Sequence, residues 1–174
     1  MKTVRRMSVL LLLALAAGCG AYRWRSDVPA GMRSISVPVF RNEGNLTGLG
    51  GEVARQVLRE IGREGTFRIA ADDDAAIEVQ GSVSASSPTV LAYERKTGAR
   101  NREHALTATA VVSFVDRRAG KVLVEDRRFT ARTTFLAGDD VLTGERDAEG
   151  RLAEDLARQI VDDLLAYRWK GNEP

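Results

Sequence analysis

Residues 76–86 read Ala-Ile-Glu-Val-Gln-Gly-Ser-Val-Ser-Ala-Ser, and this stretch is the clearest guide to the fold. Apolar or small side chains alternate with polar ones, which is the pattern of a strand with one buried and one solvated face. Residues 104–115 repeat it, with Leu, Ala, Val and Phe on one side and mainly Thr and Ser on the other. The two stretches predict a sheet that is apolar on one face only.

The strand at 76–86 is expected to continue past Pro88 towards Tyr93, and residues 94–102 are expected to form a polar loop. A tight turn over 116–121 would then join 104–115 to a last strand at 122–135. The charged run 125–128 disturbs the alternation of that last strand and indicates a bulge or an exposed stretch.

Residues 32–40 alternate as well, with Ile35, Val37 and Val39 on one side. Proline cannot donate to a strand ladder, so Pro38 predicts that this strand lies at a sheet edge or ends there. A further extended segment is expected to begin at residues 66–70.

Two stretches have helical periodicity. Residues 47–63 repeat apolar side chains at i, i+4, with Thr47 as the expected N-cap and Gly65 as the stop. Residues 145–168 form the second amphipathic helix. The predicted class is α/β in a two-layer α+β sandwich, ordered β-α-β-β-β-α, with both helices on one face of a mixed, largely antiparallel sheet of about four strands.

The N-terminus has the pattern of a secretory signal. Basic residues precede an apolar run from Met7 to Ala17, which is too short to span a membrane, and small residues lead to Cys19, the only cysteine. The sequence Ala16-Ala17-Gly18-Cys19 resembles a bacterial lipobox, which implies cleavage after residue 18 and a diacylglycerol and an acyl chain on Cys19. The alternative is that Cys19 is incidental and another bond is cut. Gly20 stands where Asp favours inner-membrane retention of lipoproteins, so the resemblance implies the periplasmic side of the outer membrane.

The predicted organisation is a signal peptide at 1–18, a lipidated tether at 19–31, one domain at 32–170 and a tail at 171–174. Tyr22 and Trp24 of the tether are expected to pack on the domain or a partner, or else to lie at the membrane interface. Of 26 basic residues, Lys2, Arg5 and Arg6 leave with the signal, so 23 remain against 24 acidic ones, a net charge of −1. This balance disfavours a nucleic-acid-binding protein.

The residues for catalysis are missing from the sequence. His104 is the only histidine and is expected to be an ordinary surface residue. Without a second histidine or a free cysteine, no ordinary zinc site or Cys–His pair is expected, and no serine lies in a Gly-x-Ser-x-Gly motif. We therefore expect no enzyme activity, no metal, and no cofactor beyond the lipid on Cys19.

One cluster of charge is a candidate binding site. The cations Arg95, Lys96, Arg100 and Arg102 lie within eight residues at an expected hairpin tip, where they could contact phosphates or an acidic partner. The alternative is that they only keep the tip soluble. Arg117, Arg118 and Lys121 form a second basic turn, expected at the opposite end of the sheet.

The whole mature chain resembles the LPS-assembly lipoprotein family (LptE, RlpB-like). The resemblance lies in Cys19-Gly20-Ala21-Tyr22-Arg23-Trp24, in Ser34-Ile35-Ser36-Val37-Pro38-Val39-Phe40-Arg41-Asn42, and in the helix, strands and closing helix that follow. It implies a non-enzymatic protein that plugs and helps assemble an LptD-type outer-membrane β-barrel and assists lipopolysaccharide transport. The basic cluster would contact lipopolysaccharide phosphates.

Two other classes stay open at this point. The stretch 35–42 followed by a helix also resembles lipoprotein activators of peptidoglycan synthases (penicillin-binding proteins), but those usually have a long tether. Here about a dozen residues, spanning at most ~40 Å, separate Cys19 from the first strand. A periplasmic hydrolase is the third class, and it lacks any catalytic set.

Overall fold

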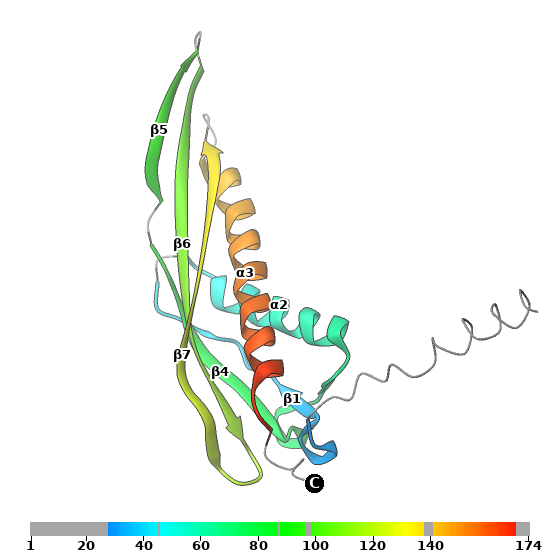
Figure 1. The fold of residues 1–174 in the computed structure, drawn as a ribbon. Helices are drawn as coiled ribbons and strands as arrows, with labels where there is room; N and C mark the ends of the chain where they lie inside the picture. Colours follow the sequence, from blue (N-terminus) through cyan, green and yellow to red (C-terminus); the bar gives the residue numbers. More distant parts are fainter. Residues whose placement is uncertain (1–27, 45, 87, 97–98, 138–140, 170–174) are drawn as a thin grey trace, which may run out of the picture.

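The computed structural model describes residues 28–44, 46–86, 88–96, 99–137 and 141–169. A seven-stranded mixed sheet and two α-helices dominate it (Figure 1). The elements in chain order are η2 (Ala30–Met32), β1 (Ser34–Ser36), β2 (Arg41–Asn42), α2 (Leu49–Glu64), β3 (Arg68–Ile69), η3 (Asp72–Asp74), β4 (Ile77–Ala85), β5 (Thr89–Lys96), β6 (Ala99–Asp116), β7 (Lys121–Ala137) and α3 (Val141–Ala166).

Strand β6 is the central strand of the sheet, with partner strands on both sides. On one side it pairs antiparallel with β4, from Ile77↔Asp116 to Ala85↔Ala108, and then with β5, from Thr89↔Ala105 to Lys96↔Ala99. On the other side it pairs antiparallel with β7. The short strands β1 and β2 join β4 in parallel, and β3 joins β1 in parallel. The largely antiparallel sheet is confirmed, with seven strands in place of the predicted four or so.

Strands β4 and β5 lie in line along the same edge of β6. The chain breaks its pairing only briefly around Pro88, where the backbone N–H of Ser86 donates to the carbonyl of Thr107 at 2.9 Å. The predicted extension past Pro88 is therefore present, although as a separate strand.

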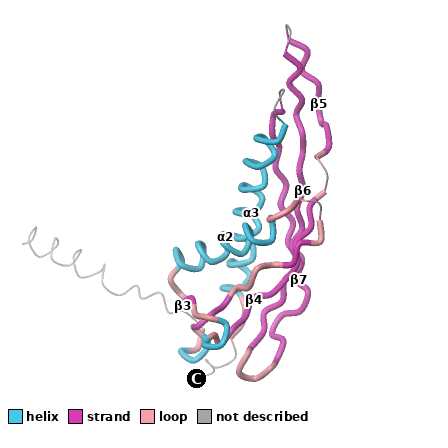
Figure 2. The backbone as a smooth tube through the Cα atoms, turned by 180° about the vertical axis from the view of Figure 1, so that it is seen from behind, coloured by secondary structure: helices cyan, strands magenta, loops and turns pink. Residues whose placement is uncertain are grey.

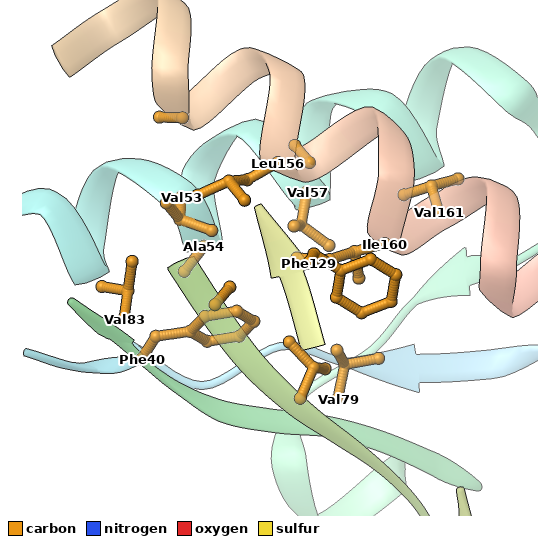
Figure 3. Packing of buried hydrophobic residues seen from close by; sticks show 14 of the residues in the cluster. Phe40, Val53, Ala54, Val57, Val79, Val83, Phe129, Leu156, Ile160 and Val161 are labelled. Carbon is orange, nitrogen blue, oxygen red and sulfur yellow. The ribbon is translucent and has the colours of Figure 1, made fainter. Parts of the chain in front are cut away.

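Helices α2 and α3 cover the same face of the sheet, and no α-helix of the described residues lies on the other face (Figures 1 and 2). The predicted apolar positions meet between these layers. Figure 3 shows Val53 and Val57 of α2 and Ile160 of α3 gathered over Val79 of β4 and Phe129 of β7. The predicted stripes are buried, because period-3.6 and period-2 patterns converge on one core.

Helix α2 ends as its sequence predicts but begins differently. Gly65 is the C-cap, with φ 78°, and its N–H donates to the carbonyl of Ile61 at 3.0 Å. The N-cap is Gly48, with φ 97° and no side-chain cap, so the prediction of Thr47 is wrong. Only a glycine takes this left-handed conformation without strain, and Gly48 is what turns the chain into the helix.

The predicted strand at 32–40 is interrupted. Strand β1 stops at Ser36, before Pro38, and β2 resumes at Arg41. Ile35 is buried, but Val39 is 74% exposed and its neighbour Phe40 is 2% exposed. The alternation therefore slips by one residue after Pro38, and Phe40 takes the core position.

Three further boundaries differ from the prediction. The polar loop at 94–102 is wrong, since β5 runs to Lys96 and β6 begins at Ala99. Helix α3 begins at Val141, four residues before its predicted start at 145. The predicted irregularity at 125–128 is confirmed, because the β6–β7 register shifts there and Asp126 has φ 48°.

Candidate functional site

The structure brings the four candidate cations together at the free end of the β5–β6 hairpin. Arg95 is the register partner of Arg100, Tyr93 pairs with Arg102, and Lys96 pairs with Ala99. This hairpin tip projects past the end of β7 (Figure 1). We define the basic tip as Arg95, Lys96, Arg100 and Arg102, whose backbone, but not side chains, the structure describes.

The pairing of Arg95 with Arg100 is unfavourable for the isolated sheet, because like charges directly opposite each other destabilise a strand pair. An anion bound at the tip would relieve that repulsion. The anion-binding interpretation of the cluster stays a prediction.

A second basic turn lies at the other end of β6, as predicted. Asp116 Oδ1 accepts hydrogen bonds from the N–H groups of Arg118 and Ala119 at 2.9 and 3.0 Å, and Gly120 closes the turn with φ 61°. Arg117 forms an ion pair with Glu78. We refer to this end of the molecule as the base, and the 18 residues of β6 separate it from the tip by about 60 Å.

The face of the sheet without helices is polar, as the alternation predicts. Threonines and serines of β6 face hydroxyl and charged groups of β4 and β7 across the strands. Thr109 Oγ1 lies 3.4 Å from Thr130 Oγ1, and the Asp126 N–H donates to Ser113 Oγ at 3.0 Å. Ser82 of β4 is 7% exposed and has register partners on both sides, Arg41 of β2 and Val111 of β6.

A groove of about 710 Å³ runs over this polar face. Its lining comes from segment 38–43, from β4 and β6, and from Asp126 of β7. Glu43 is paired with Arg41 at 3.5 Å, and Glu78 is paired with Arg117. With Val39 exposed at the rim, the groove is a mixed surface suited to contact with another polar wall.

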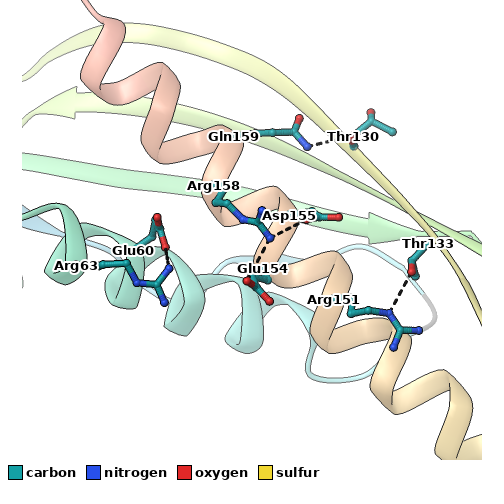
Figure 4. Close-up of polar contacts among 9 residues, drawn as sticks. All are labelled: Glu60, Arg63, Thr130, Thr133, Arg151, Glu154, Asp155, Arg158 and Gln159. Atoms are coloured by element: carbon teal, nitrogen blue, oxygen red, sulfur yellow. Dashed lines mark hydrogen bonds and ion pairs between the residues drawn. The ribbon is translucent and has the colours of Figure 1, made fainter.

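On the side of the molecule that carries the helices, several charged side chains form ion pairs with one another. Glu52 of α2 contacts Arg55, Gln56 and Arg59, and the hydrogen bond from Arg55 holds the pKa of the Glu52 carboxyl below its ordinary value. Figure 4 shows Arg63 on Glu60 in the same helix and Arg158 on Glu154 and Asp155 in α3. Arg55, Arg59, Arg63 and Arg158 are thus each paired with a carboxylate of their own helix.

His104 is not a surface residue, contrary to the prediction. It is 9% exposed in β6, and its ring stacks on Phe135 with centroids 5.3 Å apart. Neither ring nitrogen has a hydrogen-bond partner in the part of the chain that the structure describes. Among those residues, no cluster of three His, Cys, Asp or Glu side chains could hold a metal ion.

Cys19, the predicted lipid-attachment residue, lies outside the described residues. The described chain begins at Val28, which is 3% exposed and accepts a hydrogen bond from Arg33 Nε at 3.1 Å. No described helix is long and apolar enough to span a bilayer.

Two helices over one face of a long, mostly antiparallel sheet form a fold that is similar to solved structures of bacterial lipoproteins. A minor lipoprotein from Acinetobacter baumannii is similar with a TM-score of 0.52 and 18% identity, over 79% of this chain and 95% of that one. A structure from Caulobacter crescentus described as a lipoprotein has a TM-score of 0.51 and 17% identity, over 79% and 92%. At these identities the likeness shows the fold alone.

The chain belongs to the LptE lipopolysaccharide-assembly family, which matches residues 32–164. That range runs from the end of η2 almost to the end of α3, so it includes the sheet, both helices and the basic tip. No curated protein matches the chain in sequence.

Proposed function

We propose that this protein is a non-enzymatic outer-membrane lipoprotein, anchored through Cys19, that occupies the lumen of an LptD-type β-barrel and assists lipopolysaccharide transport. Membership of the lipopolysaccharide-assembly family is the observation that carries the proposal.

The shape suits a plug. The apolar band of an outer-membrane barrel is about 25 Å tall, whereas β6 alone is about 60 Å long. A rod of that length, held by its base near one leaflet, reaches through the full height of the barrel. Its open face carries hydroxyl groups such as those of Thr109 and Thr130, which match the polar lumen of such a barrel.

The charge distribution suits a ligand with phosphate groups. The basic tip stands at the end opposite to the entry of the chain at Val28 (Figure 1). Guanidinium groups bind phosphate oxygens in bidentate geometry. The tip is therefore the proposed contact for lipopolysaccharide phosphates, and the open face is the proposed contact for the barrel.

The partner is tested by affinity purification of the full-length lipidated protein from detergent-solubilised envelopes. We expect a large outer-membrane β-barrel to co-elute in about equal amount. A photo-crosslinking residue at Thr109 should link to it, while one at Arg158 on the helix side serves as the matched control. Co-elution of a penicillin-binding protein without a barrel would overturn the proposal in favour of a synthase activator.

The ligand contact is tested by replacing all four residues of the basic tip with Ala. Lipopolysaccharide binding should fall at least tenfold, and the residual binding should lose most of its salt dependence. The control replaces Arg117, Arg118 and Lys121 at the base, which should change binding less than twofold. Equal binding by both variants would remove the tip from the mechanism, and circular dichroism checks that each variant is folded.

A further inference from the structure

A second hollow lies at the base of the molecule, away from the open face. It has a volume of about 240 Å³ between the start of the described chain, the β6–β7 turn and the end of α3. Its lining includes the apolar and aromatic residues Met32, Val122, Leu123, Tyr167 and Trp169. Asp116 and Lys121 complete its lining.

The apolar and aromatic side chains that line this base pocket are more exposed to solvent than such side chains usually are. Val122 is 45% exposed, and Met32, Leu123 and Tyr167 are each only partly buried against the core. Tyr167 and Trp169 meet edge to face with ring centroids 4.9 Å apart, and Phe67 extends the group behind Trp169 at 5.8 Å. An aromatic occupant would therefore find ring faces and edges of the kind that aromatic groups prefer.

The described chain enters the domain beside the base pocket. Val28 is buried and Arg33 Nε holds its carbonyl, so the chain is fixed to the domain from residue 28 onward. A Cβ on Gly31 would lie 3.5 Å from Arg118 Nη1, so this entry passes beside the β6–β7 turn. Met32, one residue further, already lines the pocket.

Chain length limits where the preceding residues can go. Trp24 stands four residues before Val28, so its Cα lies within about 14 Å of the Val28 Cα, and that of Tyr22 within about 22 Å. The segment 20–27 reads Gly-Ala-Tyr-Arg-Trp-Arg-Ser-Asp, with two aromatic side chains among polar and small ones. The tail at 171–174, Gly-Asn-Glu-Pro, follows Trp169 closely in the sequence but offers no aromatic side chain.

We propose that Trp24 of the N-terminal segment docks in the base pocket and straps the segment to the domain. The strap leaves only the four residues between Trp24 and Cys19 free, so the base lies within about 18 Å of Cys19 instead of about 32 Å. It thereby sets the orientation of the rod relative to its anchor. This inference does not depend on the barrel or on lipopolysaccharide.

The experiment uses the full mature chain, residues 19–174, with Cys19→Ser so that no detergent is present. The chain has two tryptophans, so fluorine NMR after 5-fluorotryptophan labelling gives two resonances, and Trp24→Phe assigns them. We expect the Trp24 resonance to be displaced from its position in the unfolded chain. Val122→Glu should return it to that position, whereas the same substitution at Val39, which is exposed on the other groove, should leave it unchanged.

A second variant tests the proposal independently, in case Val122→Glu does not fold. Trp24→Ala lies outside the domain core and should shift the methyl resonances of Met32 and Leu123, but not that of Val39. Three results would overturn the proposal. In the first, the Trp24 resonance lies at its position in the unfolded chain. In the second, the resonance is displaced but Val122→Glu does not change it, although the variant is folded. In the third, the resonance is displaced only when the lipidated protein is bound to vesicles. The last would assign Trp24 to the membrane interface.

Discussion

Gly50 in α2 packs directly on the backbone of Phe40. A Cβ at position 50 would lie 2.1 Å from the carbonyl oxygen of Phe40, whereas a Cβ on the neighbouring Gly51 would meet only the end of the Arg55 side chain, at 3.8 Å. The contact explains how β2 and the buried Phe40 are held against the helix, because any larger residue at 50 would push the two elements apart.

We therefore expect Gly50→Ala to lower the free energy of unfolding by about 2–3 kcal/mol, since a backbone atom must move to admit the methyl group. Gly51→Ala is the matched control one residue away. It should cause no loss and a gain of up to about 1 kcal/mol, because alanine costs less entropy in a helix. Urea unfolding of both variants measures the difference, and equal effects would contradict the close approach.

The outer edge of β7 is covered by side chains of α3. Gln159 Nε2 donates to the carbonyl of Thr130 at 3.2 Å, and Arg151 Nη2 donates to that of Thr134 at 3.2 Å (Figure 4 shows both donor residues). An uncovered edge strand is a template for pairing with another chain. These two donors therefore stabilise the helix on the sheet and protect its edge.

Arg151→Met and Gln159→Met should each lower the unfolding free energy by about 0.5–1.5 kcal/mol, the net value of a lost hydrogen bond. The double variant should also self-associate, as seen by light scattering at high concentration. Arg158→Met is the control, because Arg158 contacts only Glu154 and Asp155 of its own exposed face and should matter by no more than about 0.5 kcal/mol. A double variant that stays monomeric would show that the edge is protected by other means.

Glu149 of α3 is a charge in an unfavourable place. Burial, followed by the nearby carboxylate of Glu145, raises the pKa of Glu149 above its ordinary value of 4.5. A carboxyl whose pKa is raised by folding is most favourable when protonated, so this contribution is present below pH 4.5 and is lost as the pH rises through the folded-state pKa.

At pH 7 we therefore expect Glu149→Gln to raise the melting temperature. Its relief of the like-charge pair with Glu145 alone is worth about 0.2–0.5 kcal/mol. The gain should disappear below about pH 4.5, where the wild-type carboxyl is also neutral. Glu154→Gln, which removes a carboxylate paired with Arg158, should give no gain at either pH. A gain at Glu149 that is independent of pH would contradict this account.

The core could be predicted because its periodicity is regular. Val79 and Val83 alternate without interruption, and Val53 and Val57 share one stripe, so burial of one face follows from geometry. The slip at Pro38, which exposes Val39 and buries Phe40, could not be predicted. It depends on how closely α2 approaches through Gly50, a contact with no signature in local sequence.

The basic tip was predicted in composition but not in structure. Residues 94–102 are polar on both sides, so no alternation marks them as strands. Strands β5 and β6 continue there because each pairs with the other's backbone, and that pairing makes Arg95 and Arg100 opposite neighbours. The base pocket was missed because it joins the chain entry, the β6–β7 turn and the end of α3. The only hint in the sequence was the pair of aromatic residues in the tether.

His104 gives a last prediction, because its burial conflicts with its chemistry. Its ring stacks nearly parallel on Phe135, at 15°, while neither nitrogen has a hydrogen-bond partner among the described residues. Leaving a buried polar group unsatisfied costs about 1–3 kcal/mol. Phenylalanine would keep the stacking and remove that cost, so His104→Phe should raise the unfolding free energy by about 1 kcal/mol. His104→Ala loses the packing and should lower it by about 2 kcal/mol or more. If His104→Phe instead destabilises the protein as much as His104→Ala, the ring nitrogens have a partner that matters, and His104 becomes a candidate for function.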